Sequence, residues 1–104
     1  MRKELAKTKI SQAIHHKDPN AMVYLFGSRA RGNNRKNSDW DILILINADK
    51  VSNEIEDGFR NELYDIELDL GQSISTFIYP KNYWTNTLKF SPLYKNILKE
   101  GIVL

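Results

Sequence analysis

Two acidic residues, Asp39 and Asp41, lie at the start of an apolar run in the stretch LFGSRARGNNRKNSDWDILILI, residues 25–46. Side chains two positions apart in a strand point to the same side of a sheet, so both carboxylates converge on one face. Paired like charges are costly unless something positive lies between them. A hard divalent cation accepts such oxygen ligands, so the spacing predicts a metal site for Mg²⁺, with Mn²⁺ as an alternative.

A glycine and a serine, Gly27 and Ser28, follow the preceding apolar run, and arginines come next at Arg29 and Arg31. The glycine leaves room around backbone N–H groups, which can donate to phosphate oxygens together with the serine hydroxyl, especially where a short helix begins. The two guanidinium groups add attraction for phosphate. Together with the aspartates, these residues are the types that phosphoryl or nucleotidyl transfer by metal-assisted in-line displacement requires.

The elements that must position these groups can be read from hydrophobic periodicity and turn signals. Apolar residues at helical spacing predict an amphipathic helix over residues 3–16, which the sequence KDPN ends. Two apolar runs of strand length follow, AMVYLFG at 21–27 and DWDILILI at 39–46. Along the second strand, Trp40 and the isoleucines share one face and the leucines lie behind the aspartates, so both faces are expected to be buried.

The second half of the chain predicts a long helix, a third strand and two short helices. A stripe of apolar residues from Val51 to Leu70 recurs every three or four positions and ends before Gly71. The segment DIELDL within it also alternates like a half-exposed strand, but the longer stripe favours the helix. SISTFIY follows as a strand. KNYWTNTL and SPLYKNILKEG are predicted as short helices, the second with Ser91 as its cap and Pro92 in its first turn.

The order helix, strand, strand, helix, strand, helix, helix predicts an α+β fold with a mixed sheet of three or four strands packed against helices. The ten residues 29–38 are too few for a helical crossover with its loops, so the first two strands are expected to be antiparallel neighbours. This pairing puts the Gly-Ser turn and the two aspartates at the same end of the sheet.

Length and composition are those of an ordinary globular protein. The 104 residues are expected to form a single domain over 1–104. The composition is 41% hydrophobic and 27% charged, and no apolar run is long enough to span a bilayer. The chain has no cysteine and its basic N-terminus lacks the apolar stretch of a signal peptide, so a cytoplasmic location is expected. Arg35 and Lys36 are interpreted as solvated loop residues, and so small a basic patch without interleaved aromatic residues argues against nucleic-acid binding.

The segment GSRARGNNRKNSDWDILI resembles the signature of the DNA polymerase beta-like nucleotidyltransferase superfamily, in its minimal (MNT) branch. A Gly-Ser pair, a ten-residue spacer and Asp-x-Asp match that signature, as do ARG within the spacer, Ser38 before the first aspartate and the aliphatic run after the second. The resemblance implies a nucleoside-triphosphate site. In it, Gly27 and Ser28 hold the triphosphate, and Asp39 and Asp41 bind Mg²⁺.

One departure from the family pattern concerns a third carboxylate, which the family usually carries on the strand after the long helix, where it completes the metal site. Aligning SISTFIY with that pattern puts Ser75 where the aspartate is expected. Glu67 or Asp69 could replace it only if the DIELDL segment formed a strand. Otherwise Asp65, Glu67 and Asp69 are expected to form a solvated helix face.

The first functional hypothesis is therefore a Mg²⁺-dependent nucleotidyltransferase that moves a nucleoside monophosphate from an NTP to an unidentified acceptor hydroxyl. Small members of the family often act with a helical partner of the HEPN type, as in two-gene toxin–antitoxin systems, so the resemblance implies such a partner or a homodimer. The alternative is a nucleotide-binding or antitoxin-like subunit with weakened catalysis, which Ser75 in place of the third carboxylate favours.

Overall fold

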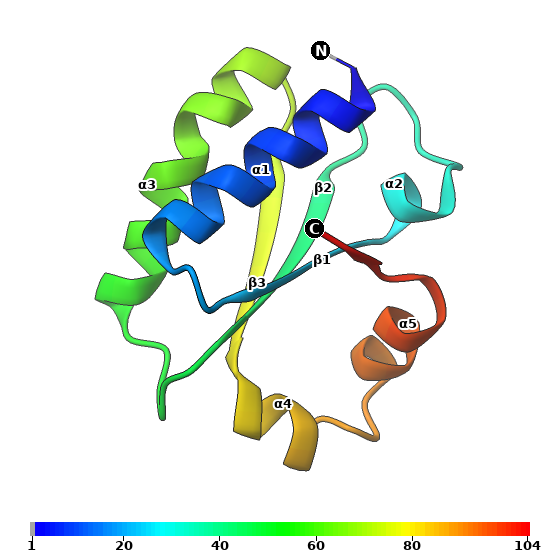
Figure 1. Cartoon of the computed structure of the whole chain (residues 1–104). Coiled ribbons are helices and arrows are strands. Elements are labelled where there is room, and N and C mark those ends of the chain that lie inside the picture. The colour runs from blue at the N-terminus through cyan, green and yellow to red at the C-terminus, as the bar shows by residue number, and fades with distance from the viewer. Residues whose placement is uncertain (1) are drawn as a thin grey trace.

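The computed structural model describes residues 2–104, which form helices packed against both faces of a four-stranded sheet (Figure 1). The elements are, in chain order, α1 (Lys3–Lys17), β1 (Met22–Phe26), α2 (Ser28–Arg31), β2 (Trp40–Ile46), α3 (Asn53–Leu70), β3 (Ile74–Pro80), α4 (Lys81–Asn86), α5 (Pro92–Glu100) and β4 (Ile102–Val103). Within the described residues, none of the helices combines the length and apolarity needed to traverse a lipid bilayer.

The sheet has the strand order β3-β2-β1-β4 and is mixed. β1 pairs antiparallel with both β2 and β4, whereas β2 and β3 run parallel and are connected through α3. The predicted α+β fold with a mixed sheet is therefore confirmed, and so is the antiparallel pairing of the first two strands. β4 is the fourth strand, and it covers the outer edge of β1 by pairing with Tyr24 and Leu25.

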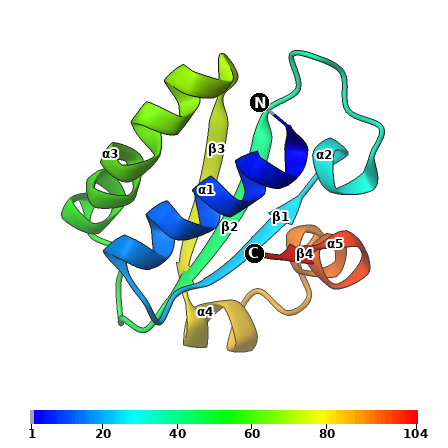
Figure 2. The ribbon, with the colours of Figure 1, turned by 45° about the horizontal axis from the view of Figure 1, so that its top comes forward.

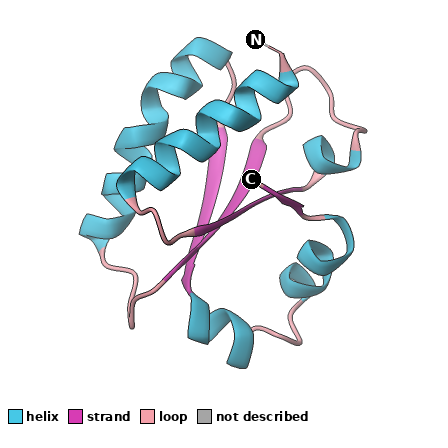
Figure 3. Ribbon diagram, in the orientation of Figure 1, coloured by secondary structure: helices cyan, strands magenta, loops and turns pink. Residues whose placement is uncertain are grey.

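Each face of the sheet has its own hydrophobic core. α1 and α3 lie side by side over one face of the sheet (Figure 3). Their buried side chains pack there with Trp40 and the isoleucines of β2. On the opposite face, side chains of α4 and α5 pack against Leu43 and Leu45, and Figure 2 shows these two helices away from α1 and α3. The prediction that both faces of the second strand are buried is confirmed. By the same alternation, Asp41 lies on the face of α4 and α5.

Capping residues mark where α3 and α5 begin and where α3 ends. Ser52 caps α3 by accepting a hydrogen bond from the Ile55 N–H at 3.1 Å, and Gly71 ends the helix in the left-handed conformation with a φ of 65°. Ser91 caps α5 in the same way. Because α3 extends to Leu70, the alternative of a strand over DIELDL is wrong.

Candidate functional site

The turn between β1 and α2 is built on Gly27. Its backbone has a φ of 75° and a ψ of −159°, a conformation that residues with a side chain rarely adopt. Ser28 then begins α2, a single turn in which the N–H groups of Ala30 and Arg31 donate to the Gly27 carbonyl. The reversal of the chain at this point therefore depends on a glycine.

Asp41 packs directly against this turn. It lies opposite Phe26 in the β1–β2 register, and a Cβ added to Gly27 would collide with its Oδ2. Only a glycine lets the backbone and the carboxylate approach this closely. The structure thus brings the Gly-Ser turn and Asp41 together at one end of the sheet.

Replacing Gly27 by alanine is expected to lower the free energy of unfolding by more than the same change at Gly32. Both glycines have positive φ, 75° and 81°, but a Cβ at Gly32 meets nothing within 4 Å. Backbone strain of roughly 1–3 kcal/mol affects both variants. It is larger at Gly27, whose ψ of −159° lies in a region that essentially only glycine adopts, than at Gly32, which is left-handed with a ψ of 7°. The collision with Asp41 adds roughly 1–3 kcal/mol at Gly27 alone. Urea unfolding measures the difference, and equal losses would show that the carboxylate does not crowd Gly27.

The two aspartates form a like-charged pair. Burial raises the pKa of Asp41 and the negative charge of Asp39 raises it further, while Arg31 opposes the shift. Among residues 2–104, no three or more His, Cys, Asp or Glu side chains gather into a cluster that could hold a metal ion. The site therefore has two carboxylates, whose oxygen atoms and mutual repulsion suit a hard divalent cation.

Ser75 lies beside the aspartates on β3. It is opposite Asp41 in the parallel β2–β3 register, and its hydroxyl donates a hydrogen bond of 3.4 Å to Asp39 Oδ2. Glu67 and Asp69 lie on α3 and have other partners, the first accepting a hydrogen bond from a backbone N–H at the start of β3. The side chain that faces the carboxylate pair from β3 is therefore a serine.

Arg29, which the sequence predicts as a phosphate-binding residue, has its side chain buried against the loop that leads to Asp39. Only 8% of the residue is exposed, and its guanidinium donates to the carbonyls of Ser38, at 2.9 and 3.0 Å, and Lys36, at 3.3 Å. It also lies over the Trp40 ring, 4.5 Å from the centroid. Burial lowers the pKa of Arg29, and the Asp39 carboxylate opposes this change. Because its Nε and Nη2 groups donate to loop carbonyls, Arg29 anchors the loop that leads to Asp39.

The same loop has a second anchor in Gln72, just beyond the end of α3. Its Oε1 accepts a hydrogen bond of 2.8 Å from the Trp40 indole, and its Nε2 donates one of 2.8 Å to the Lys36 carbonyl. These partners lie 32 and 36 positions away in the sequence. Sequence reasoning missed this residue because no local pattern connects the two segments.

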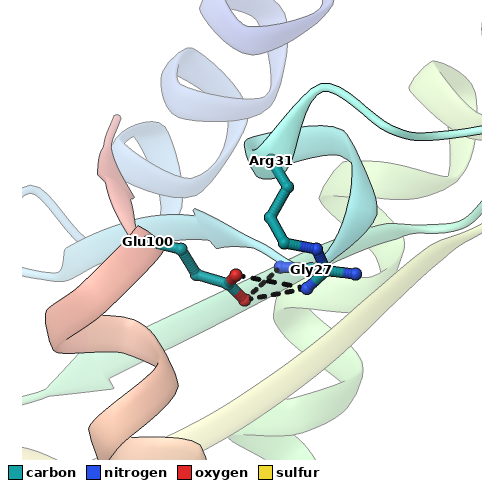
Figure 4. Close-up of polar contacts among 3 residues, drawn as sticks. All are labelled: Gly27, Arg31 and Glu100. Carbon is teal, nitrogen blue, oxygen red and sulfur yellow. Dashed lines mark hydrogen bonds and ion pairs between the residues drawn. The ribbon is translucent and has the colours of Figure 1, made fainter.

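Arg31 keeps its guanidinium at the Gly27 turn, where it is paired with Glu100 (Figure 4). Arg31 Nη1 lies 3.1 and 3.2 Å from the two carboxylate oxygens, and Oε1 also accepts a hydrogen bond of 3.3 Å from the Gly27 N–H. Glu100 was likewise missed from the sequence. It is 73 positions from Gly27, and nothing in the local sequence marks the last residue of α5 as part of the site.

A family model described as a nucleotidyltransferase domain matches residues 7–104. The chain belongs to this nucleotidyltransferase family. No curated protein matches it. Among solved structures, a mutant of the toxin–antitoxin MntA–HpeT has a similar fold, with a TM-score of 0.65 and 21% identity over 94% of this chain and 70% of that chain. A toxin–antitoxin with AMP-PNP gives a TM-score of 0.63 and 23% identity over 93% and 70%. The predictions of a nucleotidyltransferase family and of its fold are confirmed.

In this nucleotidyltransferase domain, an open depression of about 480 Å³ lies beside Asp39. The exposed side chains of Tyr64 and Leu68 on α3 supply apolar surface there, and Gln72 lies at its edge. The depression is lined by α3 and by residues 71–73 before β3, whereas the Gly27 turn follows β1, and β2 separates β1 from β3 in the sheet. The candidate site therefore has two sides, one with N–H and guanidinium donors and one with an open, partly apolar surface.

Proposed function

We propose that this nucleotidyltransferase domain transfers a nucleoside monophosphate from an NTP to an acceptor hydroxyl, with Mg²⁺ as the metal and Mn²⁺ as an alternative. The observation that carries the proposal is the close approach of the Asp41 carboxylate to the Gly27 turn. This approach supports the proposal, because groups suited to bind a metal and groups suited to donate to phosphate oxygens lie close together. The like-charged pair of Asp39 and Asp41 also fits a cation, because its repulsion is relieved when positive charge lies between them.

The residues of the site divide into metal ligands and phosphate donors. Asp39 and Asp41 hold the metal. Oxygens of the triphosphate accept hydrogen bonds from the Gly27 N–H, the Ser28 hydroxyl and the Arg31 guanidinium. A metal held by these carboxylates would neutralise phosphate charge and make the α-phosphorus easier to attack.

The transfer is an in-line displacement, in which the attacking hydroxyl and the leaving pyrophosphate lie on opposite sides of the α-phosphorus. A bond from the acceptor oxygen to phosphorus forms as the bond to the β-phosphate oxygen breaks, and the acceptor proton passes to a carboxylate or to water. Pyrophosphate held at the Gly27 turn leaves toward α2, so the acceptor approaches from the β3 side. The depression beside Asp39 lies on that side and is the candidate acceptor surface.

Ser75 favours a second candidate function, a nucleotide-binding or antitoxin-like subunit with weak catalysis. Its hydroxyl faces Asp39 at 3.4 Å, on the strand where the family usually carries a third carboxylate. Serine neither neutralises a second cation nor accepts a proton at neutral pH. Binding without efficient transfer is the behaviour expected of the domain alone under this second function.

A partner protein is part of the proposal. Two solved structures with similar folds are described as a toxin–antitoxin, one of them with AMP-PNP. We propose by analogy that a helical protein of the HEPN type, or a second copy of this chain, supplies the acceptor or completes the site. Tyr64 and Leu68, which are exposed beside the depression, offer apolar surface for such a protein.

Incubation of the purified protein with ATP, CTP, GTP or UTP labelled at the α-phosphate tests the proposal. Each NTP is supplied with Mg²⁺ or Mn²⁺, with and without the protein encoded by an adjacent gene. We expect metal-dependent transfer of label to a protein if the domain is an enzyme. Metal-dependent binding without transfer supports the nucleotide-binding subunit instead. A lack of metal-dependent binding for all four NTPs would overturn both functions.

A further inference from the structure

The Glu100 carboxylate engages the same two groups that the proposed function assigns to the triphosphate (Figure 4). Its Oε1 accepts a hydrogen bond of 3.3 Å from the Gly27 N–H, and its two oxygens lie 3.1 and 3.2 Å from Arg31 Nη1. Carboxylate and phosphate oxygens are both anionic acceptors for backbone N–H and guanidinium groups. The two anions therefore compete for these donors.

The backbone around Glu100 is held in place on both sides. The residue ends α5, and after Gly101 the chain enters β4, which pairs with β1. Gly101 packs so closely on the preceding turn that a Cβ there would lie 2.6 Å from the Ile97 carbonyl oxygen. The Glu100 side chain is partly exposed, at 17%, and its carboxylate is joined to this fixed backbone by a side chain with rotatable bonds. The carboxylate is thus a tethered ligand with a high effective concentration.

A simple surface ion pair explains only part of this arrangement. Exposed pairs between arginine and carboxylate contribute little to stability. Here the carboxylate also satisfies the Gly27 N–H, which has no backbone acceptor among the described residues. A backbone N–H needs an acceptor in the free protein. Glu100 supplies that acceptor at the position where a ligand phosphate is proposed to bind.

We infer that Glu100 is an internal anion that occupies the phosphate donors of the site until a polyphosphate displaces it. The inference rests on the proposed role of Gly27 and Arg31 as triphosphate ligands. While Glu100 occupies the donors, a ligand can bind only to the fraction of molecules in which they are free. The apparent affinity for the ligand is the intrinsic affinity multiplied by that fraction. A triphosphate brings several anionic groups and a metal and so displaces the carboxylate, whereas a single phosphate group has little advantage over it. Glu100 therefore sets the affinity of the site and favours polyphosphates.

Titration with inorganic tripolyphosphate and Mg²⁺ tests this role, because the probe carries neither base nor sugar. Glu100→Gln removes the charge at nearly constant size and is expected to bind tripolyphosphate roughly tenfold more tightly than the wild type, since it removes one charge-assisted competitor. Its preference for tripolyphosphate over orthophosphate should narrow. Glu100→Asp keeps the charge but shortens the side chain, so a smaller gain in affinity is expected even if the glutamine variant folds poorly.

The matched control is Glu56→Gln. Glu56 also pairs with an arginine, Arg60, at 3.4 Å, but on α3, and this variant should bind as the wild type does. Unchanged or weaker binding by both Glu100 variants, with wild-type binding intact, would overturn the inference and leave the proposed function standing. If neither the wild type nor the Glu100 variants bind tripolyphosphate with Mg²⁺, both the inference and the proposed function fail.

Discussion

Replacing Asp39 and Asp41 together by asparagine is expected to abolish metal-dependent binding of NTP while the chain stays folded. Asparagine keeps the size of each side chain but removes both charges on which a divalent cation depends. Among the described residues there is no third carboxylate in the cluster to hold the metal instead. The affinity should fall by more than the roughly 10- to 100-fold that is typical when a residue hydrogen-bonded to a metal ligand is replaced. Isothermal titration calorimetry with ATP and Mg²⁺ measures it.

The control for this experiment is Asp57→Asn combined with Asp65→Asn. Both residues are exposed on α3, and the double substitution changes the net charge of the protein by the same amount. The control should retain wild-type affinity. Unchanged metal-dependent affinity in the variant of Asp39 and Asp41 would remove these two residues from the site.

The same variant of Asp39 and Asp41 should be more stable than the wild type at neutral pH when no metal is present. Burial and the charge of Asp39 raise the pKa of Asp41, so the folded protein holds this proton more tightly than the unfolded chain does. Ionisation of Asp41 therefore destabilises the fold as the pH rises through the raised pKa. The advantage of the variant should disappear below the usual aspartate pKa of about 3.9. Urea unfolding in EDTA at several pH values measures the difference in stability between the variant and the wild type. A variant that is more stable only at low pH would contradict the ionisation of Asp41 as the cause.

Ser75→Asp is expected to raise metal-dependent nucleotidyl transfer by roughly 100- to 10,000-fold, the usual effect of a general base. Position 75 lies opposite Asp41 in the register and beside Asp39, so a carboxylate there completes a cluster of three. Such a cluster can share the metal and accept the proton of the attacking hydroxyl. The release of pyrophosphate from NTP, with the partner protein or water as the acceptor, measures the rate.

Ser75→Asn is the matched control, because asparagine has the shape of aspartate without its charge. It should show no gain in transfer. Ser75→Asp should also be less stable than Ser75→Asn without metal, since a third negative charge joins the pair, and Mg²⁺ should restore part of that stability. Equal transfer rates for the two variants, or efficient turnover by the wild type alone, would mean that the serine does not limit catalysis.

Several parts of the site follow from short stretches of sequence. The spacing of Asp39 and Asp41 determines that both carboxylates share one side of a strand, because side chains alternate along an extended backbone. The Gly27-Ser28 pair predicts the tight turn, because glycine alone adopts its backbone angles readily. The short connection between β1 and β2 determines their antiparallel pairing. β4 could not be located in this way, because its two residues are too few to show a period.

Only the tertiary structure decided which side chains complete the site. Arg29 stands within the signature, yet loop carbonyls use its guanidinium, whereas Glu100 reaches the Gly27 turn from 73 positions away. Ser75 meets Asp39 because α3 returns the chain as a parallel strand in one particular register. Contacts of this kind depend on strand register and on side-chain direction across separate elements. Periodicity and spacing describe the backbone of one element at a time, so they predict which face a residue occupies but not its partner across the fold.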